Sequence, residues 1–184
     1  VAWVDQAFSS ADIESAKYPG APREASESGS FLARFLGSYA SSATVLDDRS
    51  IPLAQAQDAE MVAENTRFVQ EAGANGVVLL GRNGALILGD IPTALHVQVD
   101  APVEVRIARA AREAGIDEAQ AARRQRNEDR IRVEMSQRFY YWNPMDIDRY
   151  DLIVNTGALD VDTCVDVILA AYQAKIARAA QATG

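Results

Sequence analysis

The sequence predicts an α/β protein with a mostly parallel sheet flanked by helices. Short apolar runs of strand length alternate with longer segments whose apolar residues recur at helical spacing. The run GVVLL at 76–80 is unbroken, which is typical of a parallel strand covered on both faces. The chain has 184 residues, 48% of them hydrophobic, so a single domain can form a sizeable core.

The elements follow from the spacing of apolar residues and from turn signals. We expect strands at 1–5, 76–80, 94–99 and 150–156, and helices at 31–40, 53–72, 100–113 and 117–139. The C-terminal helix should have one apolar face, formed by Val161, Val165, Ile168, Leu169, Tyr172 and Ile176. Residues 9–30 are rich in Ser, Gly, Pro and Glu and are expected to form a mobile loop with at most one short helix.

Two acidic residues are candidate helix N-caps. Asp100 precedes Pro102 at the start of the predicted helix 100–113. Asp117 and Gln120 have the spacing of a capping box. His96, the only histidine, lies in a predicted strand and is expected to be packed or at a sheet edge rather than catalytic.

Composition narrows the functional class. The formal net charge of −8 counts against general nucleic-acid binding. No run approaches the roughly 20 apolar residues of a membrane span, and no basic leader is visible at the start. The single cysteine, Cys164, rules out an internal disulfide and is expected to be buried and inert. These features favour a cytoplasmic setting.

The positive charge is concentrated in one stretch. Between Arg106 and Arg138 there are nine arginines and six acidic residues, a local charge of +3 in an acidic chain. Such a stretch is typical either of an anion site or of exposed helices with i,i+4 ion pairs. The charge pattern leaves both interpretations open.

An arginine between glycines follows the strand at 76–80. In Gly81-Arg82-Asn83-Gly84 the glycines permit a tight turn and a close approach of the backbone to a ligand. In open α/β sheets, ligands bind outside the carboxyl ends of the strands. Arg82 offers a planar donor for phosphate or carboxylate at such an end. A turn with a surface arginine is the alternative.

The order of these features resembles the cytidylate kinase-like family. The segment GVVLLGRNGALILGDIPTALHVQVDAPVEVRIARAARE at 76–113 resembles the middle of cytidylate kinases. The segment RRQRNEDR at 123–130 is similar to the arginine pattern of their lid. The ending YDLIVNTGALDVDTCVDVILAAY resembles their last strand and helix, and SQRFYYWNPMDIDRYDL fits the longer connection of the cytidylate kinase-like subgroup.

The resemblance implies a P-loop nucleoside monophosphate kinase fold with an arginine-rich helical lid. It implies ATP and Mg²⁺ as cofactors and phosphoryl transfer to CMP or a related monophosphate. Residues 1–184 would form a single kinase-like domain. Residues from about 9 to 45 would be a mobile insert on the acceptor side, and those from about 114 to 149 the lid region. Homo-oligomerisation is left open, and neither a membrane nor a nucleic acid is expected as a partner.

The resemblance also implies roles for individual residues. Arg82, with Gly81 and Asn83, would bind the acceptor monophosphate. The lid arginines Arg123, Arg126 and Arg130 lie on one helix face by their spacing and would act on the transferring phosphates. Asp5 and Arg49 are further candidates for acceptor contacts. The alternatives are salt bridges of the lid arginines with Glu128, Asp129 or Glu134, a helix cap at Asp5 and a solvated turn at Arg49.

The sequence departs from the family pattern in two respects. The P-loop pattern G-x-x-x-x-G-K-[ST] does not occur in the 184 residues. Because VAWVD resembles the second strand of the fold, a βα unit of about 20–30 residues would be expected before it. Loss of the P-loop, leaving an inactive nucleotide-binding protein, and pairing with another subunit are the alternatives. Asn83 and Asn127 also replace acids that the family usually has.

Overall fold

A computed structural model of the chain describes residues 2–5, 51–81 and 83–182. The predicted loop 9–30, the predicted helix 31–40, Arg49 and Arg82 lie outside the described residues. The chain divides into two compact units, Val1–Asn83 with Arg130–Pro144, and Gly84–Asp129 with Met145–Gly184.

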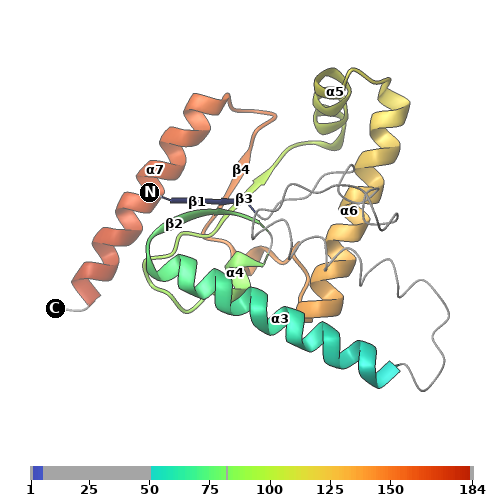
Figure 1. The fold of residues 1–184 in the computed structure, drawn as a ribbon. Helices are drawn as coiled ribbons and strands as arrows, with labels where there is room; N and C mark the ends of the chain where they lie inside the picture. Colours follow the sequence, from blue (N-terminus) through green and yellow to red (C-terminus); the bar gives the residue numbers. More distant parts are fainter. Residues whose placement is uncertain (1, 6–50, 82, 183–184) are drawn as a thin grey trace. The chain divides into compact units, whose positions relative to one another are not determined.

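The first unit is built on two parallel strands (Figure 1). Strand β1 (Ala2–Asp5) pairs with β2 (Val77–Leu80), so that Ala2 lies opposite Val77 and Asp5 opposite Leu80. Helix α3 (Ile51–Ala74) leads into β2 through a turn at Gly76, whose φ of 69° suits glycine. The expected helix 53–72 and strand 76–80 are therefore confirmed.

The core of the first unit lies around α3 and the second part of α6 (Glu118–Tyr140). Met61 and Val69 are buried on α3, as the apolar spacing predicts. Their counterparts on α6 and just after it are Ile131, Met135, Phe139 and Trp142. Two polar contacts link the helices: Asn65 Nδ2 donates to the Tyr140 hydroxyl at 2.5 Å, and Arg138 Nη2 donates to Asp58 Oδ2 at 2.6 Å.

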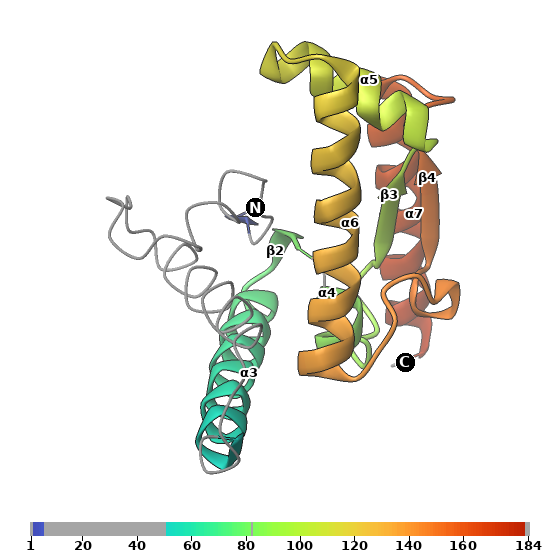
Figure 2. The same cartoon turned by 90° about the vertical axis from the view of Figure 1, so that its right-hand side faces the viewer.

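The second unit holds the other parallel pair. Strand β3 (Val97–Asp100) pairs with β4 (Leu152–Asn155), with Asp100 opposite Asn155. Helix α7 (Val161–Ala182) packs along β4, as Figures 1 and 2 show. The remaining elements are α4 (Gly84–Ile87), α5 (Val103–Ala114), the first part of α6 and the 3₁₀ turn η1 (Ile147–Arg149). The α/β class and the parallel pairing are confirmed.

One of the two predicted helix caps is confirmed and the other is wrong. Asp117 Oδ1 accepts a hydrogen bond from the Gln120 amide at 2.7 Å, directly before α6. Asp100 does not cap α5, because β3 continues through Asp100 and Pro102 occupies the N-cap position without a side-chain cap. The Asp100 carboxylate instead accepts a hydrogen bond from the Ala101 amide at 2.8 Å.

The predicted apolar face of α7 is only partly covered. Cys164 is buried as expected, with its Sγ 3.9 Å from the Leu159 carbonyl oxygen. Val161 is 76% exposed, and Val165, Leu169 and Tyr172 are each about half exposed. Ile168 and Ile176 are half-buried, so the packed side of α7 runs through Cys164, Ile168 and Ile176 and leaves the flank with Val161, Val165 and Leu169 open.

His96 is half-buried directly before β3, where its amide donates to Asp151 Oδ2 at 2.8 Å. Burial lowers the pKa of His96; nearby Asp151 opposes this effect and Lys175 adds to it. The imidazole is therefore neutral in the folded protein near neutral pH, while it can still take up a proton in the unfolded chain.

The lowered pKa of His96 predicts that acid destabilises the protein. Below the unfolded-state pKa of about 6.5, the unfolded chain binds a proton that the folded chain excludes. Stability is therefore fully present above that pH and falls as the pH decreases from 7.5 to 5.5. Thermal unfolding of the wild type and of His96→Gln should show a steeper loss of Tm in the wild type. Parallel pH profiles for the two proteins would contradict this prediction.

Candidate functional site

The Gly-Arg-Asn-Gly turn begins directly after β2, at the carboxyl end of the first sheet. Gly81 is exposed and follows Leu80. Because Asp5 lies opposite Leu80, the end of β1 lies at the same edge as Gly81. The side chain of Asp5 is outside the description. Thus two of the predicted site residues, Asp5 and Gly81, lie at one strand edge through their backbones.

Asn83 fixes this turn to α6. Its Oδ1 accepts hydrogen bonds from Ser136 Oγ at 3.1 Å and from Trp142 Nε1 at 2.9 Å. Ser136 and Trp142 are both buried, so one side-chain oxygen satisfies two buried donors. The sequence suggested Asn83 as a substrate contact, and the structure shows that its oxygen anchors the turn that carries Arg82.

The predicted lid arginines differ in their surroundings. Arg130, in the first unit, donates through Nη1 to both carboxylate oxygens of Glu134, at 2.9 and 3.1 Å. Both side chains are about half exposed, so this i,i+4 pair contributes little to stability. Arg123 and Arg126, in the second unit, are exposed and make no ion pair within residues 2–5, 51–81 and 83–182.

The carboxyl end of the second sheet carries a denser polar cluster, which sequence reasoning missed. Arg106 Nη1 donates to both carboxylate oxygens of Asp129, at 2.8 and 3.1 Å, and Arg106 Nε donates to the Ala101 carbonyl. Asp129 also accepts a hydrogen bond from Gln125. The side chains of Arg106 and Asp129 are 25% and 39% exposed, so water screens this pair less than the Arg130–Glu134 pair.

A second arginine of α5 holds the end of β4. Arg109 donates through Nη2 to the Thr156 carbonyl at 3.1 Å and through Nη1 to its hydroxyl at 3.4 Å. Thr156 in turn donates to the Asp100 carbonyl from both its amide and its hydroxyl. A Cβ at Gly157 would lie 2.8 Å from Pro102 Cδ, so only glycine fits there without a shift of the loop. The sequence shows Arg106 and Arg109 in the helix after Asp100, but not that Asp100 and Asn155 end neighbouring strands.

The described residues can also be compared with the ligand sets of metal sites and with membrane-spanning helices. Among the residues that the structure describes, no three or more His, Cys, Asp or Glu side chains are grouped so that they could hold a metal ion. In the same residues, no helix is both long enough and apolar enough to cross a membrane.

A solved structure with a similar fold supports the α/β assignment. An uncharacterised protein from Eubacterium ventriosum superposes with a TM-score of 0.56 and 22% sequence identity, over 62% of this chain and 65% of that chain. The comparison shows a shared fold of helices and parallel strands.

The chain belongs to the cytidylate kinase-like family, whose profile matches residues 2–158. A cytidylate kinase from Methanopyrus kandleri is 30% identical over 125 residues, which are 62% of this chain and 64% of that protein. A cytidylate kinase from Archaeoglobus fulgidus is 38% identical over 85 residues, 44% of this chain and 45% of that protein. The predicted family is confirmed.

A third relative has a different name. A uronate isomerase from Corynebacterium glutamicum is 38% identical over 139 residues, which are 69% of this chain and 27% of that protein. The chain thus spans between 27% and 64% of the length of these three relatives.

The anchoring role of Asn83 predicts a loss of stability on truncation. Asn83→Ala leaves the buried Ser136 hydroxyl and Trp142 indole without their acceptor, which should cost about 1–3 kcal/mol in the free energy of unfolding. Asn83→Asp keeps an acceptor oxygen and should retain most of the stability. Asn75→Ala, at an exposed site, should change it by less than about 0.5 kcal/mol. Urea unfolding measures all three, and an unchanged midpoint for Asn83→Ala would refute the anchor.

Two arginine–carboxylate pairs involve α6, one of them shared with α5, and can be compared directly. A double-mutant cycle of Arg106→Gln and Asp129→Asn should give a coupling energy of about 1 kcal/mol or more, because the pair joins two elements and is partly buried. The matched cycle of Arg130→Gln and Glu134→Gln should give about 0.3–0.5 kcal/mol. Equal coupling energies would show that the Arg106–Asp129 pair is no stronger than a solvated helix pair.

Proposed function

We propose that this protein takes part in ATP-dependent phosphoryl transfer to CMP or a related nucleoside monophosphate. The observation that carries the proposal is the pair of exposed lid arginines, Arg123 and Arg126, in a chain of the cytidylate kinase-like family. Phosphoryl transfer needs donors that align two phosphates and neutralise developing charge, rather than covalent chemistry from the protein. An exposed arginine without a carboxylate partner suits that task.

We propose one group of residues for binding the acceptor phosphate and another for contacting the transferring phosphates. At the first edge, Arg82 would hold the acceptor phosphate, with Gly81 allowing close approach and Asn83 holding the turn in place. Asp5 and Arg49 are proposed as further acceptor contacts. Arg123, Arg126 and Arg130 would act on the transferring phosphates. Arg130 would have to exchange Glu134 for phosphate, which an exposed pair can do at low cost.

ATP and Mg²⁺ enter the proposal through the family. Mg²⁺ usually keeps several waters and binds one or two protein groups together with substrate phosphates, so it needs no protein-only cage. The residues present are compatible with that mode, since Asp5 ends β1 at the proposed acceptor edge. Bound Mg²⁺ would neutralise phosphate charge, while the arginines of this chain orient the phosphates.

The phosphate-binding loop is proposed to come from a segment outside the 184 residues. An isolated two-stranded sheet is marginally stable, and parallel sheets are normally covered on both faces. In the first unit Trp3, Val78 and Leu80 are 62%, 48% and 43% exposed, and in the second unit Val99 and Ile153 are also exposed. This bare apolar surface supports a further strand and helix, which would carry the glycine-rich loop.

The runner-up is a protein that binds nucleotides without catalysis. It uses the same proposed anion contacts, Arg82, Arg123 and Arg126, but predicts no phosphoryl transfer. Isomerase activity is not proposed, because the similarity to the uronate isomerase covers only 27% of that protein.

The test is an assay of the full-length natural protein with ATP, Mg²⁺ and a panel of nucleoside monophosphates. We expect turnover with at least one pyrimidine monophosphate. The variant with both Arg123→Gln and Arg126→Gln should lose about 100-fold or more in kcat, because it removes donors to the transferring phosphates. Arg112→Gln, an exposed arginine of α5, is the matched control and should keep full activity.

The two candidate functions give different outcomes. Stabilisation by nucleotide without product would favour the binding protein, since a ligand of the folded state raises Tm in either case. Neither turnover nor stabilisation by any monophosphate would overturn both.

A further inference from the structure

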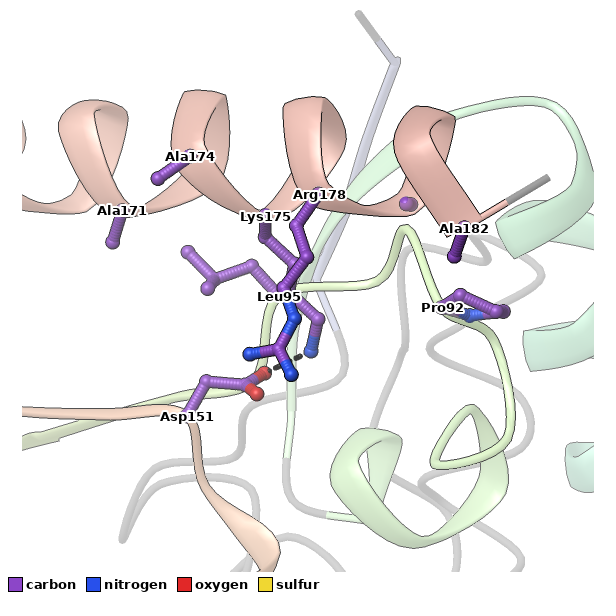
Figure 3. A pocket seen from close by; sticks show the side chains of 9 residues that line it. Pro92, Leu95, Asp151, Ala171, Ala174, Lys175, Arg178 and Ala182 are labelled. Carbon is purple, nitrogen blue, oxygen red and sulfur yellow. Dashed lines mark hydrogen bonds and ion pairs between the residues drawn. The ribbon is translucent and has the colours of Figure 1, made fainter. Parts of the chain in front are cut away.

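A groove of about 440 Å³ lies in the second unit, beside the C-terminal half of α7 (Figure 3). Its apolar lining comes from α7 and from the segment that leads to β3: Pro92, Leu95, Ala171, Ala174, Ala179 and Ala182. Its polar residues are Asp151, Lys175 and Arg178. Because Asp151 directly precedes β4, the groove lies at the amino ends of the strands, away from Asp100 and Asn155. It is therefore separate from the phosphate site proposed above.

An ion pair forms the polar wall of the groove. Lys175 Nζ donates to Asp151 Oδ2 at 2.5 Å, and the same oxygen accepts the His96 amide at 2.8 Å. Burial alone would raise the pKa of Asp151, but the hydrogen bonds from His96 and Lys175 hold it below its usual value. The carboxylate is thus ionised at neutral pH and offsets the charge of Lys175, while the neighbouring His96 is neutral.

Arg178 supplies a positive charge beyond this pair. In Figure 3 its guanidinium extends from α7 into the groove toward the Asp151 carboxylate. Among residues 2–5, 51–81 and 83–182 it makes no ion pair or hydrogen bond. The three polar side chains together carry a net charge of +1 at one end of a wall of methyl groups.

The groove is open on one side, and its volume and mostly apolar lining fall within the range of small-molecule sites. Such sites have volumes of about 300–1,000 Å³, mostly apolar walls and a few convergent polar groups. The small alanine side chains leave space that larger side chains would fill. An apolar ligand chain that lies along them would bury its surface away from water, which favours binding. The guanidinium fork matches a carboxylate. A single surplus charge favours a carboxylate over a phosphate, which carries nearly two charges at neutral pH.

We propose that this groove binds a small apolar carboxylate, with its head group on Arg178 and its chain along the alanine side of α7. The juxtaposition of Arg178 with Ala171, Ala174 and Ala182 carries the proposal, which does not depend on kinase activity.

The test uses octanoate as the probe and the full-length natural protein labelled with ¹³C at the alanine methyl groups, at pH 7. We expect the methyl signals of Ala171, Ala174 and Ala182 to shift together and to saturate with one Kd, on the order of a few millimolar. Acetate, which lacks the chain, and octanol, which lacks the charge, should bind much more weakly.

Variants separate this groove from the other apolar surface of α7. Arg178→Gln should weaken octanoate binding by about tenfold or more, and Arg112→Gln should leave it unchanged. Ala174→Phe, which fills the groove without changing its charge, should abolish the response. Leu169→Gln, on the exposed flank of α7, should retain it.

Three results would overturn the proposal. One is the absence of saturable shifts at about ten times the expected Kd. Another is equal binding of octanoate and octanol. The third is loss of binding in Leu169→Gln together with its retention in Arg178→Gln and Ala174→Phe, which would place the ligand on the apolar flank instead.

Discussion

Parallel pairing is the constraint on which the rest of this structure depends. When two strands run in the same direction, their carboxyl ends meet at one edge, and residues far apart in the sequence become neighbours there. In the first unit this rule places Asp5 beside the Gly81 turn. In the second it places Asp100 beside Asn155. Both units thus concentrate polar groups at one strand edge, and the helices that follow contribute arginines to the edge of the second.

Arginines in this protein have three different surroundings, although the sequence shows them as one basic stretch. Arg106 and Arg109 donate to protein acceptors around the ends of β3 and β4 and hold that edge in shape. Arg130 forms a solvated pair on its own helix. Arg123 and Arg126 lie exposed on α6. The positive charge of a sequence stretch therefore does not locate a ligand site. An arginine can bind a ligand anion only if its guanidinium is not already bound to acceptors within the protein.

The sequence predicted the α/β class, the four described strands and the long helices, because strand-length apolar runs and helical periodicity are local properties. It also predicted the buried Cys164 and the cap at Asp117. The predicted cap at Asp100 was wrong, because β3 continues through Asp100 and Pro102 takes the N-cap position. The sequence also missed the Arg106–Asp129 contact, which joins residues 23 positions apart. Periodicity could not tell that the apolar flank of α7 would stay open, since burial depends on what packs beside a helix.

The buried position of Cys164 has a practical consequence. It is the only thiol in the sequence, and it lies in the first turn of α7, near the carbonyl of Leu159. A thiol reagent can reach it only when this turn moves away from the loop before it. The rate of alkylation therefore reports, without any engineered label, how often the start of α7 opens. A nucleotide or carboxylate that stiffens the second unit would slow that reaction, and one that leaves the unit unchanged would not.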